Sequence, residues 1–306
     1  MTALIVIGGP TASGKSALAL RLAEAVRGMT INADSMQLYR DLRILTARPT
    51  PEDEARVPHR LYGVLDAEDP ASAGRWLELA GIAIGEARAE RRPAIVVGGT
   101  GLYLHALLHG IAPIPEIPAA VRSEARARFA ALGAPAFHAE LAKRDPAAAA
   151  RLGPSDRQRL IRAYEVVVGT GRSLAAWQAV PPVRVELPTP RIGMALTPPR
   201  AALYERIGPR LHEMIERGAL VELEALRRRR LDPELPLMKA VAVPELLAHL
   251  EGRVDLATAL DRAIVQTRRY AKRQLTWLRH QLPELRRLET FGDAADLPAS
   301  ACAGPC

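Results

Sequence analysis

A glycine-rich octapeptide near the N-terminus contains the residue types that hold a phosphate. It matches the complete pattern G-x-x-x-x-G-K-[ST] and reads Gly9-Pro10-Thr11-Ala12-Ser13-Gly14-Lys15-Ser16. The backbone N–H groups of such a loop and the positive end of the following helix surround one anion. Lys15 adds a point charge, and the Ser16 hydroxyl is a ligand for Mg²⁺. We therefore expect the loop to bind a di- or triphosphate; the alternative is a chance match in a Gly-rich turn.

A carboxylate and a hydroxyl follow two other apolar segments. Asp34 follows residues 29–33, and Thr100 follows residues 94–99. Ligands of open parallel sheets lie beyond the carboxyl ends of the strands, so we expect both side chains beside the phosphate loop. In that place Asp34 is able to ligate Mg²⁺, to accept a proton from a nucleophile, or only to cap a helix. Thr100 has the same alternative role as a helix cap.

The elements that position these residues alternate between apolar runs and helical patterns. We expect strands over 3–7, 29–33, 60–65 and 94–97, and helices over 14–26, 73–91 and 101–108. This alternation predicts an α/β fold, namely a P-loop NTPase-like parallel sheet flanked by helices with right-handed crossovers.

A change of pattern divides the chain. Residues 119–178 are helical and basic between proline-rich stretches, and a last strand is predicted over 191–196, followed by a helical C-terminal region. We predict a catalytic core formed by residues 1–112 and 191–290, a helical insertion domain over 113–190, and a flexible tail over 291–306.

The charge favours a polyanionic partner. The formal net charge is +8, although only four of the 42 basic residues are lysine, and this arginine bias weakens the inference. Cys302 and Cys306 lie in the predicted tail, where a loose terminus is favoured over a metal site or a disulfide. With neither a signal peptide nor a membrane-length apolar run, we expect a cytoplasmic monomer.

Seven segments, taken together, resemble the tRNA dimethylallyltransferases, also called the tRNA isopentenyltransferase family. The segments are G-P-T-A-S-G-K-S at 9–16, N-A-D-S-M-Q-L-Y at 32–39, T-A-R-P at 46–49, V-P-H at 57–59, V-G-G-T-G-L-Y-L at 97–104, D-R-Q-R-L-I-R-A at 156–163 and A-K-R-Q-L-T-W-L-R at 271–279.

This resemblance implies a prenyl transfer to tRNA. A dimethylallyl group would pass from dimethylallyl diphosphate to N6 of the adenosine at position 37, immediately 3′ of the anticodon, so that residues 9–16 hold a diphosphate leaving group. By similarity Asp34 is the general base, Thr100 and Lys15 are further catalytic residues, and Ser16 holds Mg²⁺ as the cofactor. Arg210 is implied to bind the diphosphate, with Arg206 as its rival.

The resemblance also assigns contacts with the anticodon stem-loop of tRNA. The implied contact residues are Asp34, Ser35, Met36, Gln37, Thr100, Arg122, Gln158, Arg159, Leu160, Ile161 and Arg162. Independently, helical spacing over 261–280 predicts a basic face opposite an apolar stripe, and we add Lys272, Arg273 and Arg279 from that helix. A plain solvated face is the alternative for this helix.

Two departures from the family pattern and two other functions remain to be weighed. Met238–Val243 lacks the usual glycine and aromatic residue, which affects the expected tRNA contacts near Lys239, and Arg48 replaces a lysine. A small-molecule or nucleotide kinase would also use a phosphate loop beside a carboxylate, but leaves the basic helix unexplained. A nucleotide-dependent RNA-binding switch is disfavoured because no Walker-B-like strand follows the loop.

Overall fold

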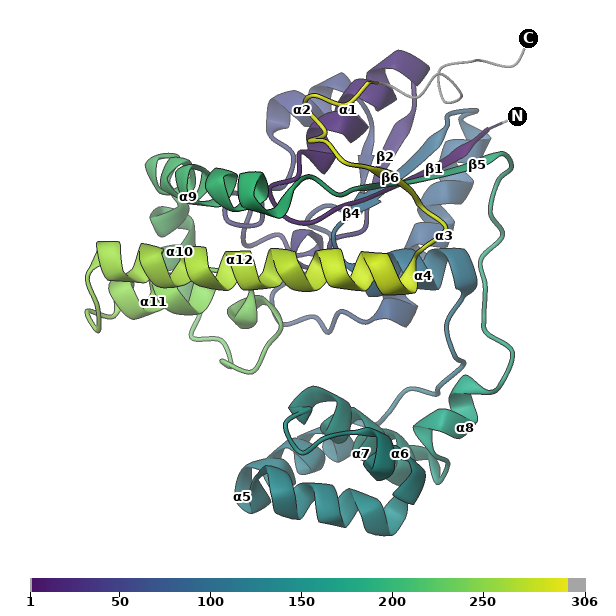
Figure 1. The fold of residues 1–306 in the computed structure, drawn as a ribbon, viewed down its shortest axis with the longest axis vertical. Coiled ribbons are helices and arrows are strands. Elements are labelled where there is room, and N and C mark those ends of the chain that lie inside the picture. The colour runs from purple at the N-terminus through teal and green to yellow at the C-terminus, as the bar shows by residue number, and fades with distance from the viewer. Residues whose placement is uncertain (1, 297–306) are drawn as a thin grey trace. The chain divides into compact units, whose positions relative to one another are not determined.

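A parallel sheet forms the centre of the larger of two compact units. The computed structural model describes residues 2–296, and within this range the sheet has six strands in the order β3-β2-β4-β1-β5-β6 (Figure 1). The strands are β1 Leu4–Gly8, β2 Met29–Asn32, β3 His59–Arg60, β4 Ala94–Gly98, β5 Arg191–Leu196 and β6 Arg286–Leu288. All neighbouring pairs are parallel, which confirms the predicted α/β class.

The central strands are apolar because both faces of the sheet are covered. Every residue of β1 and β4 is buried, and Ile5, Ile7 and Val97 belong to one core cluster with Leu18 and Leu22 of helix α1. A strand buried on both faces reads as a continuous apolar run, which is why the sequence predicted these two strands correctly.

The edge strands were predicted poorly. Of the predicted strand 60–65 only Arg60 belongs to a strand, β3 His59–Arg60, because Leu61 and Gly63 both adopt a positive φ that ends the extended backbone. The edge strand β6 was missed, since its sequence Arg286-Arg287-Leu288 is short and mostly polar.

Helices cover the sheet and extend beyond its carboxyl edge. In the larger unit they are α1 Lys15–Val26, η1 Met36–Leu38, α2 Pro51–Arg56, α3 Ala73–Ala89, α4 Gly101–His109, α9 Arg200–Glu216, α10 Ala219–Arg228, η2 Leu237–Lys239, α11 Val243–Leu250 and α12 Leu256–Gln281. Among the described residues, no helix is both long enough and apolar enough to cross a membrane.

The smaller unit comprises residues 109–184, close to the insertion predicted over 113–190. It contains α5 Ala119–Arg144, which is two helices meeting at Gly133, together with α6 Pro146–Arg151, α7 Arg157–Thr170 and α8 Leu174–Gln178. Its core is built around Phe137, Leu141, Leu160 and Tyr164. A two-way backbone pairing of Ile111 with Val183, with N–O distances of 3.0 and 2.9 Å, closes the unit.

The prediction of a flexible tail over 291–306 places the start of the tail too early in the chain. Residues 291–296 have a defined place: Ala295 is buried in the sheet core, and the Gly292 N–H donates to the Ser13 carbonyl at 2.9 Å. The sequence could not indicate this, because the segment has no periodicity and docks onto a loop almost 280 positions away. The remaining part of the predicted tail, including Cys302 and Cys306, lies outside the described residues.

Candidate functional site

Strand order places the three predicted loops at one edge of the sheet. Strands β2, β4 and β1 are neighbours, so Asp34, Thr100 and the phosphate loop follow adjacent strand ends. The Thr100 N–H donates to the Ala33 carbonyl at 3.2 Å, and the Thr100 hydroxyl accepts from the Ser35 N–H at 2.9 Å. The chain therefore holds the hydroxyl of Thr100 directly beside the residue that follows Asp34.

The phosphate loop has the expected strand–loop–helix context. It leaves β1 at Gly8 and enters α1 at Lys15, and Gly14 caps the helix with a left-handed backbone at φ 80°. Ser13 is fully buried, and its N–H donates to the Pro10 carbonyl at 3.3 Å. The loop thus presents Lys15 and Ser16 at the first turn of α1, where the positive helix end favours an anion.

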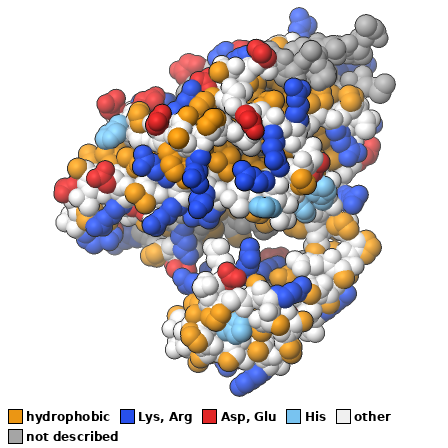
Figure 2. Space-filling model, in the orientation of Figure 1, with side chains coloured by type: hydrophobic (Ala, Val, Ile, Leu, Met, Phe, Trp, Pro, Cys, Tyr) orange, Lys and Arg blue, Asp and Glu red, His pale blue; other side chains and the backbone are white. Residues whose placement is uncertain are grey.

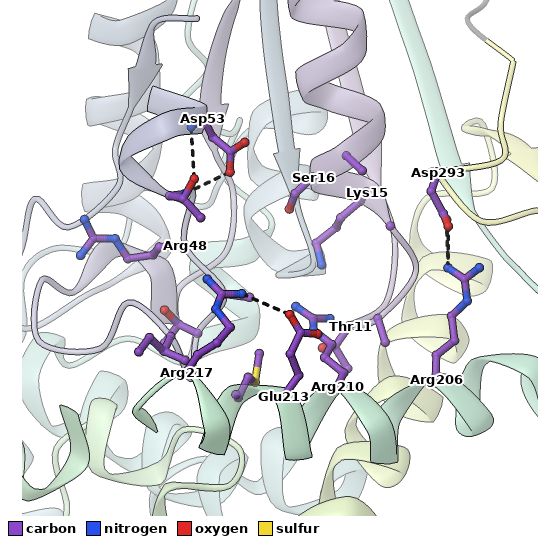
Figure 3. Close-up of a pocket in the computed structure, with 18 of the residues that line it drawn as sticks. Thr11, Lys15, Ser16, Arg48, Asp53, Arg206, Arg210, Glu213, Arg217 and Asp293 are labelled. Atoms are coloured by element: carbon purple, nitrogen blue, oxygen red, sulfur yellow. Dashed lines mark hydrogen bonds and ion pairs between the residues drawn. The ribbon is translucent and has the colours of Figure 1, made fainter. Parts of the chain in front are cut away.

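A cavity of about 950 Å³ opens beside this loop. Lys15, Ser16 and Asp34 line it together with Arg206 and Arg210 of α9. Figure 3 shows Lys15 and Ser16 on one side of the cavity and Arg210 on the other. Cationic groups on α1 and α9 therefore face one space that also contains a carboxylate. In this cavity the cationic groups could contact a diphosphate, and the carboxylate could accept a proton from a neighbouring substrate group.

Burial changes the protonation of Lys15. Desolvation lowers the pKa of its ammonium from 10.5 to about 8, the negative charge of Asp34 opposes that shift, and Arg210 reinforces it. The Nζ atom donates to the Pro10 carbonyl at a long 3.4 Å. The chain thus compensates little of the desolvation cost of the Lys15 ammonium, and a bound anion would favour its charged form.

The Asp34 carboxylate uses one oxygen for structure. Its Oδ1 accepts from the Met36 N–H at 3.1 Å, which closes a turn just before η1, whose N-cap position is occupied by Ser35 rather than by Asp34. Asn32 holds the same turn, because its Oδ1 accepts from the Asp34 N–H at 2.7 Å. Asp34 also lines the cavity, so the hydrogen bond to Met36 leaves this residue available for chemistry.

The two rival arginines of α9 have different surroundings. Arg206 is 2.9 Å from the Asp293 carboxylate and stacks over the Phe291 ring at 3.6 Å. Arg210 lies close enough to Lys15 and Asp34 to influence both electrostatically, and its own burial lowers the pKa of its guanidinium. Figure 3 shows Arg206 directed to Asp293 and Arg210 directed to the cavity. Arg210 is therefore the better placed of the two to meet an anion.

Residues 291–296 brace the phosphate loop from outside; we call them the C-terminal strap. Arg21 of α1 donates to the carbonyls of Gly292, Asp293 and Ala295 at 3.2, 3.1 and 3.0 Å. Gly14 and Gly292 lie so close that a Cβ on Gly14 would be 2.9 Å from the Gly292 nitrogen. The strap thus fixes both the loop and Arg206.

Three side chains that the sequence assigned to tRNA have structural roles. Leu160 and Ile161 are buried in the core of the smaller unit, so their side chains are corrected to packing residues. Helix α7 turns them inward while Gln158 and Arg159 remain exposed, and Arg162 pairs with Glu165 at 3.4 Å. The Gln37 amide donates to the carbonyls of Thr46 and Ala47 at 2.8 and 2.9 Å, so it holds a neighbouring loop.

Two positioning side chains were missed by the sequence analysis. Glu222 of α10 accepts from the N–H groups of Arg43, Ile44 and Leu45, and thereby holds a wall of the cavity. Gln274 of α12 accepts from the Thr11 N–H at 2.8 Å. No local pattern marks Glu222, whereas Gln274 lies inside the segment 271–279 already singled out for its resemblance.

The outer face of α12 is basic as predicted. Arg269, Lys272, Arg273 and Arg279 are exposed, whereas Ala263, Ala271 and Leu278 are buried. Figure 2 shows Lys and Arg side chains along the face of the larger unit over which α12 runs.

Magnesium is compatible with the donor set of the cavity. The described residues contain no cluster of three or more His, Cys, Asp or Glu side chains, so an all-protein metal cage is absent from that part of the chain. The Ser16 hydroxyl and the Asp34 carboxylate both line the cavity. Mg²⁺ typically takes one or two protein ligands and completes its shell with water and substrate phosphates, which such a pair suits.

Comparisons with known proteins identify close relatives. The family model described as IPP transferase matches residues 37–281. A tRNA dimethylallyltransferase of Rhodospirillum rubrum is 58% identical over 279 residues, covering 91% of this chain and 86% of the relative. A tRNA isopentenylpyrophosphate transferase structure from Bacillus halodurans is 34% identical with a TM-score of 0.66, covering 94% and 90%. A eukaryotic dimethylallyltransferase described as acting on tRNA is 26% identical with a TM-score of 0.74, covering 95% of this chain and 74% of that one.

Proposed function

Because the chain belongs to the IPP transferase family, we propose that it transfers a dimethylallyl group from dimethylallyl diphosphate to N6 of the adenosine at position 37 of tRNA. Its relatives include the tRNA dimethylallyltransferase of Rhodospirillum rubrum, at 58% identity. The observation that carries the proposal is a single cavity in which a phosphate loop faces a carboxylate, Asp34. The products are prenylated tRNA and diphosphate.

The phosphate loop and Arg210 receive the leaving group. As the bond between allylic C1 and oxygen breaks, its electron pair stays on the diphosphate, whose charge rises. Loop N–H groups, Lys15 and Arg210 oppose that charge in a partly buried site, where such interactions are strong. Mg²⁺ at the Ser16 hydroxyl would supply further neutralisation of the diphosphate when bound.

Asp34 and Thr100 serve the acceptor base. The N6 lone pair forms the new bond to C1, and the N6 proton that must then leave passes to the Asp34 carboxylate and on to water. Thr100 is a catalytic residue in this proposal and keeps the turn in place, because its hydroxyl accepts from the Ser35 N–H. The hydrogen bond from the Met36 N–H to Asp34 Oδ1 fixes the carboxylate, so its second oxygen is left for the substrate.

The proposed set of tRNA contacts combines residues that the family resemblance assigns with cations of the basic face of α12. In the larger unit it comprises Ser35, Met36, Lys272, Arg273 and Arg279; in the smaller unit it comprises Arg122, Gln158, Arg159 and Arg162. Phosphates of the anticodon stem-loop are the chemistry these side chains suit. We propose that the enzyme acts as a monomer.

A direct assay tests the reaction. Purified protein is incubated with dimethylallyl diphosphate, Mg²⁺ and unmodified tRNA, and the nucleosides are analysed by mass spectrometry. The Asp34→Asn variant retains an oxygen for the Met36 N–H but cannot take up a proton at neutral pH. We expect turnover to fall by at least about a hundredfold, within the range for general bases, while tRNA affinity remains within about twofold.

Two results would contradict the proposal. One is phosphoryl transfer from ATP to a small molecule without prenylation, which is the kinase alternative. The other is full transfer activity in Asp34→Asn, which would retain the reaction but remove Asp34 as its base.

A further inference from the structure

Gln274 of α12 joins two loops of the site through one buried amide. Its Oε1 accepts from the Thr11 N–H at 2.8 Å, and its Nε2 donates to the Gly99 carbonyl at 2.8 Å. The residue is 6% exposed. Both ends of the amide are therefore used, one on the phosphate loop and one on the loop between β4 and α4.

The chain is built to allow this close approach. A Cβ on Gly99 would be 2.4 Å from the Gln274 Nε2, so a larger residue at position 99 would displace the amide. Two flanking residues of α12 seat the helix on the same strand ends. The Trp277 ring lies against Gly101, and the Leu278 side chain lies against Gly8. The amide is thus held in place by packing of the next turn of α12.

Each hydrogen bond of the amide fixes one loop of the site, the phosphate loop or the loop that carries Thr100. The bond to Thr11 orients the second x position of the phosphate loop, two residues before Ser13 and three before Gly14. The bond to the Gly99 carbonyl fixes the residue before Thr100. The Thr100 hydroxyl in turn accepts from the N–H of Ser35, the residue after Asp34. Loss of the amide would remove this partner from a partly buried N–H and from a buried carbonyl, at a cost that falls on both loops.

We propose that Gln274 is a positioning residue that keeps the diphosphate-binding loop and the Thr100 loop in register. It touches neither substrate and acts through Thr11 and Gly99. The exposed face of the same helix carries Arg269 and Arg273, so the element proposed to lie along tRNA also holds the two loops together. This inference rests on the proposed function.

The test separates the two loops by using two measurements. Gln274→Met keeps the length of the side chain and removes both hydrogen bonds. We expect the Kd for inorganic pyrophosphate, measured with Mg²⁺ by calorimetry, to rise about fivefold, and kcat for tRNA prenylation to fall about tenfold, as for lost buried hydrogen bonds. Gln266→Met, two turns earlier on α12 and half-buried, is the matched control and should leave both within twofold.

A double-mutant cycle distinguishes positioning from general support. If Gln274 acts through the Thr100 loop, Gln274→Met should lower kcat less than threefold in a Thr100→Ala background. Wild-type Kd and kcat for Gln274→Met would overturn the proposal, and an equal tenfold loss of kcat in both backgrounds would overturn its coupling to the Thr100 loop. Failure of the proposed function would appear differently, as absent prenylation by the wild type, and the pyrophosphate measurement would still test the bond to Thr11.

Discussion

Lys15 is the residue whose charge the cavity controls most directly. Burial lowers the pKa of its ammonium to about 8 in the free protein, despite the nearby Asp34. A bound diphosphate would stabilise the ammonium and raise that pKa. The proton is therefore held more tightly in the complex, and the affinity for the anion is highest when Lys15 is already charged.

The affinity for pyrophosphate should consequently weaken as pH rises through 8. Linkage to one proton predicts that the Kd increases about tenfold between pH 7 and pH 9, which calorimetry at fixed ionic strength would measure. Lys15→Arg is the control, because a guanidinium stays protonated over this range and should flatten the profile. An unchanged wild-type Kd from pH 7 to pH 9 would mean that Lys15 does not contact the anion in its charged form.

Helix α11 shows how an element tolerates a departure from the family pattern. The segment Met238–Val243 lacks the glycine that is usual in the family pattern. In the structure Ala242 nevertheless adopts the left-handed conformation, with φ 74°, as the residue before α11 begins, and it is buried. The turn is therefore retained with a residue that is strained in this conformation.

Ala242→Gly should stabilise the protein. Relief of the left-handed alanine is worth about 1 kcal/mol, reduced by the greater freedom of glycine in the unfolded chain. Urea unfolding followed by circular dichroism measures the change in the free energy of unfolding. The neighbour Ala240, at φ −59°, is the control, and Ala240→Gly should destabilise. Destabilisation by Ala242→Gly as well would show that the alanine methyl contributes more by packing than it costs in strain.

Helix α12 offers a test of nucleic-acid binding at the scale of an element. If Arg269 and Arg273 lie along phosphates, replacing both with glutamine should lower the slope of log K against log salt by about 2. Filter binding of tRNA over a range of salt concentrations gives the slope. Arg88→Gln on α3, whose guanidinium pairs with Glu186 at 3.0 Å, provides an exposed control. An unaltered slope would leave the basic face of α12 as a solvated surface.

At the scale of the whole molecule, the C-terminal strap connects the end of the described chain to its beginning. It contributes a buried alanine, a backbone hydrogen bond to Ser13, and the carboxylate that holds Arg206. A chain ending at Thr290 should therefore melt lower than one ending at Asp296. We expect a difference of about 5 °C, on the scale of 1–2 kcal/mol for a domain of this size.

The same pair of truncations tests the link between the strap and the site. The Kd for pyrophosphate should rise severalfold in the shorter protein, because the phosphate loop loses its brace at Gly14 and Ser13. Equal melting temperatures and equal Kd values in the two proteins would show that the strap supports neither.

Some of the site was predictable because the necessary signals are local or follow from one rule. The phosphate loop is contiguous, and its strand and helix are marked by their own apolar patterns. Asp34 and Thr100 were placed beside it because parallel strands end at the same edge of the sheet. The family resemblance then indicated a leaving diphosphate and an adenine acceptor.

The sequence by itself determined the loop, the parallel sheet, the helical unit and the basic face of α12, since each follows from residue types at short spacing. Only the tertiary structure decided that Arg206 is held by Asp293, that Leu160 and Ile161 face a core, and that residues 291–296 belong to the larger unit. It also revealed Gln274 and Glu222 as the supports of the site. The physical reason is distance along the chain. Gln274 and Glu222 accept hydrogen bonds from backbone groups more than 170 residues away, and no periodicity or short motif encodes such a contact.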